Sequence, residues 1–254
     1  MRKPYYRMCR PNKGLDEYPK PYIDKKNVID WNSSIRAFDL MVTDFKKICE
    51  YIDPSDSNIV VYSHRLYEMF IRICTELESN MKAILSANGY IKKNKKKIIS
   101  KEYWSITDYK KLEKPLKLSE YKVLINIWDN GRGLEIIPFA NLAKGKTKKL
   151  VWYQDYNDVK HNREDKFHLA SLENVIESFC GLFVILFAQF GVQVFNAYQI
   201  ITEWDEDSSN EIISERFSLF SLKPPMWTEE EKYNFDWDVI KGTPDPFIKF
   251  YQKI

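Results

Sequence analysis

Glycine and cysteine are scarce in this sequence, and each shortage excludes a class of protein. Only 8 of the 254 residues are glycine, too few for a glycine-rich nucleotide-binding fold or a β-sandwich dense in turns. The 4 cysteines show no C-x-x-C pair and no regular spacing. Three of them lie in apolar helical patterns, where a free thiol packs as a small hydrophobe. We therefore expect a reduced, cytoplasmic protein.

Familiar catalytic and membrane signals are also missing. The 3 histidines form no H-E-x-x-H zinc motif, and there is no Walker loop, dinucleotide-binding fingerprint or nucleophile elbow. The basic N-terminus has no apolar run, so we predict no signal peptide. The most apolar stretch, residues 179–188, is too short to span a bilayer and is predicted to be a buried helix. We expect no cofactor, no metal and no membrane partner.

The sequence has ample material for a core and two local concentrations of charge. Hydrophobic residues make up 44% and aromatic residues 15% of the chain, well outside the disordered range. The net charge of +3 indicates no particular partner. Lysines are nevertheless clustered at residues 92–97 and 144–149. The first cluster is either a solvated loop or a nucleic-acid contact.

Hydrophobic periodicity predicts a mainly α-helical fold, an antiparallel bundle with a small β-hairpin insertion. Helices are expected at residues 33–52, 61–87, 106–113, 148–161 and 169–190. Asn88-Gly89 and Gly191 are predicted helix stops. Residues 121–127 and 134–139 are predicted to form the hairpin around Asn130-Gly131.

Three regions follow from this pattern. Residues 1–30 are predicted to be an irregular arm and residues 31–195 a helical domain, with the insertion at about 90–146. Residues 196–254 form an extension rich in aromatics and proline, with a predicted strand near 217–220. So much aromatic surface is a liability in water, so we expect this irregular tail to dock on the helices.

The densest group of polar side chains lies between Trp152 and Arg163. At helical spacing Asn157, Lys160 and His161 stand at i, i+3 and i+4, so they share one polar stripe. The neighbouring stripe is largely apolar and consists of Trp152, Tyr156 and Val159. Such a helix presents an amide, an amine and an imidazole at the edge of its core, which is typical of a phosphate-binding or proton-transfer site.

The order of these elements resembles the HEPN superfamily of small helical domains. The family signature is an arginine, a polar residue, three variable residues and a histidine. Asn157 and His161 occupy the polar and histidine positions, whereas Tyr156 stands where the arginine should be. The resemblance covers roughly residues 33–90 and 147–191.

This resemblance implies metal-independent cleavage of RNA by a homodimer, in a toxin–antitoxin or phage-defence setting with an antitoxin or regulatory protein as partner. It implies His161 as the acid–base group, Asn157 as the residue that positions it, and Tyr156 as the third member of the catalytic motif. The candidate RNA- or phosphate-binding residues are Lys148, Lys149, Lys160 and Arg163. The alternative is a non-catalytic HEPN-like module that binds RNA, a nucleotide or a protein partner, and Tyr156 favours it.

Each of these residues also has a purely structural interpretation. His161 can pair with Glu164 or with the end of its helix, and Asn157 can be a buried amide bonded to a neighbouring helix. Tyr156 fits a core position, and Lys160 and Arg163 fit solvated charges. If the long helices pack antiparallel, three residues of the second are expected to face the motif helix: Arg65, Arg72 and Glu76.

Overall fold

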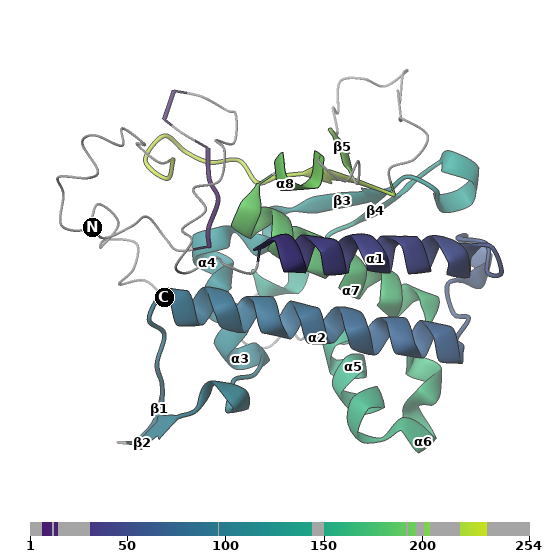
Figure 1. The fold of residues 1–254 in the computed structure, drawn as a ribbon, viewed down its shortest axis with the longest axis horizontal. Helices are drawn as coiled ribbons and strands as arrows, with labels where there is room; N and C mark the ends of the chain where they lie inside the picture. The colour runs from purple at the N-terminus through teal and green to yellow at the C-terminus, as the bar shows by residue number, and fades with distance from the viewer. Residues whose placement is uncertain are drawn as a thin grey trace.

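The computed structural model is centred on three long helices, shown in Figure 1. They are α1 (Trp31–Cys49), α2 (His64–Ala87) and α7 (Leu172–Phe190). The residues that the structure describes are 7–11, 13–14, 31–95, 97–143, 150–191, 193–196, 201–203 and 219–232. α1 and α2 lie side by side and run in opposite directions, and α7 packs against both. The predicted mainly α-helical class is confirmed.

Shorter elements complete the described part of the chain. The short helices are α3 (Ile106–Tyr109), α4 (Glu113–Leu116), α5 (Val151–His161), α6 (Arg163–Lys166) and α8 (Gln193–Asn196). The strands are β1 (Lys92–Asn94), β2 (Lys97–Ile99), β3 (Lys122–Ile125), β4 (Leu134–Ile136), β5 (Ile201–Glu203) and β6 (Phe220–Lys223). Single turns of 3-10 helix are η1 (Asp56–Asn58), η2 (Lys101–Tyr103), η3 (Lys110–Leu112), η4 (Leu118–Glu120), η5 (Trp128–Gly131), η6 (Ala140–Leu142) and η7 (Phe167–Leu169).

The ends of the long helices follow local chemistry. The Ser63 hydroxyl accepts a hydrogen bond from the Leu66 amide at 3.2 Å and thereby starts α2. Gly89 (φ +72°) and Gly191 (φ +74°) adopt the left-handed region directly after α2 and α7. Both predicted helix stops are confirmed.

Helix α2 begins later than residue 61, where the sequence pattern places its start. Tyr62 forms an isolated antiparallel bridge with Ser171, and the Leu172 amide donates to the Val61 carbonyl at 2.8 Å. Pairing of this kind needs extended backbone, so the residues before Ser63 cannot be helical. A contact with a segment more than a hundred positions away therefore decides this boundary.

The predicted hairpin is confirmed, and it belongs to a larger sheet. β3 pairs antiparallel with β4, with Val123 opposite Ile136. On its other side β3 pairs antiparallel with β6, with Val123 opposite Leu222, and β5 adds in parallel to β6. The strand order β4-β3-β6-β5 joins the insertion to the C-terminal extension in one mainly antiparallel sheet.

Two local details of the insertion differ from the sequence expectation. The hairpin loop is wider than a two-residue turn, because the last pair of the β3–β4 ladder is Ile125 with Leu134. Within the loop Asp129 and Asn130 have positive φ, and Trp128 is buried, its indole donating to Asp56 at 2.8 Å. The lysine cluster at 92–97 contributes to a second hairpin, β1–β2, which was not predicted. Its described lysines are largely exposed, as in a solvated element.

The described part of the C-terminal extension packs on the helices through Phe220, whereas the predicted docking of the tail from residue 233 on lies outside the described residues. The Phe220 ring stacks on Phe183 of α7 at 5.2 Å between centroids and lies 5.9 Å from Phe38 of α1. The strand that carries it, β6, begins at the end of the predicted range 217–220. It lies between β3 and β5, where both of its edges are paired.

The described part of the N-terminal arm is irregular, and its residues 7–11 are buried. The Cys9 amide donates to the Ala188 carbonyl at 2.7 Å, and Arg7 Nε donates to Gln189 Oε1 at 2.7 Å. Arg10 lies over the Trp227 ring at 4.5 Å. Residues 7–10 are therefore held between the end of α7 and the C-terminal segment.

Helix α7 forms the centre of the core. Among the described residues it is the one helix long and apolar enough to cross a membrane, yet 89% of that apolar window is buried inside the fold. The prediction of a buried helix at residues 179–188 is confirmed. Its apolar surface is covered by the protein itself.

Truncation of Phe220 tests whether the C-terminal strand contributes to the stability of the helical core. We expect Phe220→Ala to lower the free energy of unfolding by about 3–5 kcal/mol, because a fully buried aromatic ring leaves a cavity. Met226→Ala, at a position that is 84% exposed, is the matched control and should cost far less. Urea denaturation followed by circular dichroism measures both. Equal losses in the two variants would contradict this account of the sheet.

Candidate functional site

Helix α5 carries the motif and is anchored by its aromatic face. The Trp152 indole donates to the Pro138 carbonyl at 3.0 Å, and its ring meets Phe139 edge-on at 6.0 Å. Tyr156 and Val159 are both completely buried. The stripe predicted to be apolar is therefore the face that packs on α2 and α7. The polar stripe is left at the edge, as expected from the spacing.

Tyr156, which stands where the HEPN-like motif would have arginine, lies in the core with no exposed surface. Its ring packs edge-on to Phe70 of α2 at 6.0 Å between centroids. Burial raises the pKa of its hydroxyl, so the group is neutral at physiological pH. That hydroxyl accepts a hydrogen bond from Lys160 Nζ at 3.0 Å. Tyr156 therefore packs the core and orients the lysine one turn later.

The position of Lys160 is fixed by its neighbours. Its amine lies 5.1 Å from the centroid of the Tyr156 ring, a cation–π contact. Burial alone lowers the pKa of Lys160, but the hydrogen bond to Tyr156 and the negative charge of Glu78 outweigh it and raise the pKa. The ammonium is therefore charged at neutral pH, and its two contacts with Tyr156 hold it against the surface of α5.

A second tyrosine of α5 binds the carboxylate that influences Lys160. The Tyr153 hydroxyl donates to Glu78 Oε1 at 2.6 Å, which fixes Glu78 of α2 at the α2–α5 interface. Burial, and then this hydrogen bond, raise the pKa of Tyr153. The sequence analysis missed Glu78, because the two residues are 75 positions apart and no spacing rule connects them.

Asn157 and His161 lie on the accessible side of α5. Asn157 is half-buried, and its amide nitrogen donates to the Tyr153 carbonyl of its own helix at 2.8 Å. Among the residues that the structure describes, it has no hydrogen bond to a neighbouring helix. His161 is exposed, and within the described part of the chain no ion pair joins it to Glu164. The imidazole is therefore open to solvent one turn after the carboxamide.

Arg163 follows α5 at the start of α6 and rests on an aromatic platform. Its guanidinium lies over the Tyr67 ring at 4.6 Å and over the Phe167 ring at 5.6 Å. One of its nitrogens is 3.2 Å from His64 Nδ1, and His64 packs on Phe167 at 4.8 Å between centroids. The turn itself is set by Asn162, whose side chain caps α6.

The platform joins elements that are distant in the sequence. His64 is 99 positions from Arg163, and no pattern in the sequence indicated that Tyr67 and Phe167 would lie beside this arginine. Helical periodicity identifies the solvent face of each helix, but it does not state which two faces meet. No sequence signal available from one chain would have found this cluster.

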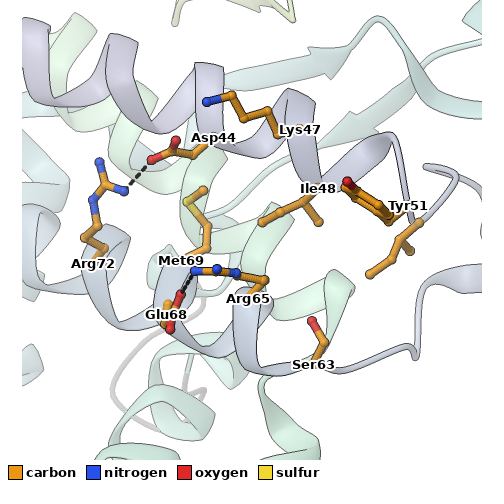
Figure 2. Close-up of a pocket in the computed structure, with 10 residues that line it drawn as sticks. Asp44, Lys47, Ile48, Tyr51, Ser63, Arg65, Glu68, Met69 and Arg72 are labelled. Carbon is orange, nitrogen blue, oxygen red and sulfur yellow. Dashed lines mark hydrogen bonds and ion pairs between the residues drawn. The ribbon is translucent and has the colours of Figure 1, made fainter.

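Arg65 and Arg72 do not face the motif helix, which corrects the expectation for these two arginines. Arg72 forms an ion pair with Asp44 of α1 at 2.6 Å, and Arg65 pairs with Glu68 at 2.8 Å. Both lie on the part of α2 that is directed at α1 and solvent (Figure 2). α2 thus presents two separate polar surfaces, and only the one at His64 adjoins the motif.

Carboxylates gather where α5 meets the start of α7. Asn174 Nδ2 donates to Asp155 Oδ2 at 2.9 Å and to the Leu169 carbonyl at 2.8 Å. Burial, together with the negative charges of Glu173 and Asp155, raises the pKa of Glu177 to about 7. This acidic group lies on a different side of α5 from the side that Lys160 occupies, by helical spacing.

Other candidates are placed as follows. Lys148 and Lys149 lie outside the described residues. Lys92 of the first lysine cluster forms an ion pair with Asp108 at 2.9 Å. The described ranges contain no group of three or more histidine, cysteine or acidic residues arranged to hold a metal ion. Comparison of the chain with protein-family models, with curated proteins and with solved structures found no match.

The raised pKa of Glu177 has a consequence for stability. An acid whose pKa is about 7 in the folded protein and about 4.5 when unfolded opposes folding once the pH exceeds the lower value. Stability is therefore lost as the pH rises through this window. We expect Glu177→Gln to raise the free energy of unfolding by about 1–3 kcal/mol near pH 8, with little effect near pH 5.

Urea denaturation of the two proteins at both pH values measures this difference. Glu164→Gln, at an exposed position of α6, is the control and should change stability less. A gain for Glu177→Gln that is the same at both pH values would refute the titration of Glu177 as its cause.

Proposed function

We propose that this protein is a HEPN-like, metal-independent endoribonuclease, and that the end of α5 with α6 is its RNA-binding surface. The observation that carries the proposal is the exposed imidazole of His161, which follows the oriented Lys160 and precedes the aromatic-supported Arg163. This end of the molecule projects from the long helices on the side away from the sheet (Figure 1). The helices α1, α2, α5 and α7 supply a scaffold compatible with a HEPN-like bundle.

The chemistry suits the residues present. RNA carries its own nucleophile, the 2′-hydroxyl, so an enzyme needs to move protons and to stabilise charge on the phosphate. His161 is the acid–base group, since the two ring nitrogens of an imidazole can accept and donate a proton. The carboxamide oxygen of Asn157 accepts no hydrogen bond among the described residues and serves to orient the imidazole or a water. Lys160 supplies positive charge to the phosphate.

Arg163 provides the recognition that the missing motif arginine would give. A guanidinium binds two phosphate oxygens at once, and Tyr67 and Phe167 hold its plane. The rings also offer faces on which unpaired RNA bases stack. Lys148 and Lys149 extend the cationic surface in this proposal. The protein acts as a homodimer that pairs two motifs, in the cytoplasm of a prokaryote, in defence or with an antitoxin or regulatory partner.

A second candidate is a non-catalytic module that binds RNA, a nucleotide or a protein partner. It is favoured by Tyr156, which replaces the motif arginine with a buried, neutral side chain. It is also favoured by Asn157, whose amide nitrogen is used by its own helix. On this view the cationic surface persists and the proton transfer is lost.

Cleavage of labelled total RNA in EDTA distinguishes the two candidates. We expect His161→Ala to reduce the cleavage rate by about 100-fold or more, because general acid–base catalysis is worth that much. His168→Ala replaces another exposed histidine and is the matched control, with unchanged activity. RNA binding without cleavage by the wild type supports the second candidate. Equal cleavage by the wild type and His161→Ala reveals a contaminant and removes the enzymatic proposal.

The role of Arg163 is tested by the salt dependence of RNA binding. We expect Arg163→Ala to weaken binding and to reduce the slope of log K against log salt by about 0.7, the value for one phosphate contact on a single strand. Arg163→Lys keeps the charge but loses the planar stack, so affinity should fall while the slope is retained. Arg65→Ala, on the other polar surface of α2, is the control. A slope that Arg163→Ala leaves unchanged contradicts the phosphate contact.

A further inference from the structure

A pocket lies between the second half of α1 and the first half of α2, on the surface of α2 that does not adjoin the motif helix (Figure 2). Its volume is about 570 Å³, within the range of sites for small organic ligands. Nothing in the proposed ribonuclease chemistry uses it. The loop between α1 and α2 closes one end, with Ser63 at the start of α2 among the lining residues.

The floor of the pocket is apolar. Ile48 and Ile52 contribute partly buried side chains from the α1 side, and Met69 contributes a side chain that is 3% exposed from α2. Tyr51 stands at the edge with 87% of its surface exposed. An aromatic ring left this open beside an apolar floor is available to a ligand, and methionine adapts readily to the shape of one.

The rim carries an excess of positive charge. Three cations and two carboxylates line the pocket, so the net charge is 3 − 2 = +1. The cations are Lys47, Arg65 and Arg72, and the carboxylates are Asp44 and Glu68. Glu68 pairs with Arg65, and Asp44 pairs with Arg72. Among the described residues Lys47 forms no ion pair. A ligand with one negative charge would neutralise the rim.

The arginines are only partly committed to these carboxylates. Arg65 and Glu68 are 79% and 59% exposed, and each arginine uses one nitrogen in its ion pair. Exposed pairs of this kind contribute little stability, whereas a guanidinium binds an incoming anion through two parallel hydrogen bonds. The Arg65 fork can therefore take up an anionic group at small cost to the fold.

We propose that this pocket binds an amphipathic organic anion, a small molecule with an apolar, ring-sized body and one anionic group. The body occupies the floor against Ile48, Met69 and Tyr51. The anionic group pairs with the Arg65 guanidinium, and Lys47 of α1 adds positive charge at the opposite rim (Figure 2). Charge complementarity selects this class over neutral apolar molecules, and the volume of about 570 Å³ fits a small molecule.

The probe for this proposal is 8-anilinonaphthalene-1-sulfonate, which combines aromatic rings with one sulfonate and fluoresces in apolar sites. We expect saturable binding of one molecule per chain to the folded full-length protein. N-phenyl-1-naphthylamine has nearly the same rings without the charge, and we expect its affinity to be about tenfold lower, the equivalent of one charge-assisted contact. Equal affinity for the two dyes overturns the assignment of the anion site.

Variants locate the bound probe. Lys47→Ala and Arg65→Ala should each weaken it about fivefold to tenfold, and Ile48→Trp should abolish binding by filling the floor while keeping every charge. Lys46→Ala removes a charge from the adjacent position, outside the pocket lining, and Arg163→Ala removes one from the RNA surface. Both should bind the probe as the wild type does.

The thermal unfolding midpoint of each variant confirms that its fold is intact. Binding that survives Ile48→Trp, or falls equally in Lys46→Ala and Lys47→Ala, overturns the proposal. Probe binding and RNA cleavage are tested independently, because the pocket and the proposed RNA surface lie on different surfaces of α2. Failure of one proposal therefore leaves the other in place.

Discussion

The close packing of α7 against α2 and α5 is the constraint on which the other elements depend. At Gly181 an added Cβ would lie 3.3 Å from Leu77 of α2 and 3.4 Å from Trp152 of α5. The absence of a side chain there lets both helices approach the core helix closely. On another side of α7, Phe38 of α1 and Phe220 of β6 both stack on Phe183.

Because of this packing, α2 contributes side chains to two separate surfaces. α2 meets α5 through Phe70 and Glu78, and its start meets α6 and η7 through His64 and Tyr67. Another side of α2 carries the arginines of the α1–α2 pocket. The proposed RNA surface and the proposed anion pocket therefore share a rigid support without sharing side chains.

Much of the fold could be predicted from the sequence, because local rules govern it. Apolar periodicity placed α1, α2 and α7, and the glycines at 89 and 191 marked two of their ends. The hairpin was found from alternation and a turn signal. The start of α2 was placed too early, because the bridge between Tyr62 and Ser171 has no local signature. The pairing of β6 with β3 was not predicted for the same reason.

The sequence by itself determined which face of each helix is apolar, and therefore that Tyr156 points inward while His161 stays at the surface. That outcome follows from the 3.6-residue period of the helix and from the free energy of removing apolar groups from water. Only the tertiary structure decided that Arg163 rests on Tyr67 and Phe167 and that Arg72 turns toward α1. Contacts between distant segments depend on how whole helices pack, and no short-range spacing encodes that arrangement.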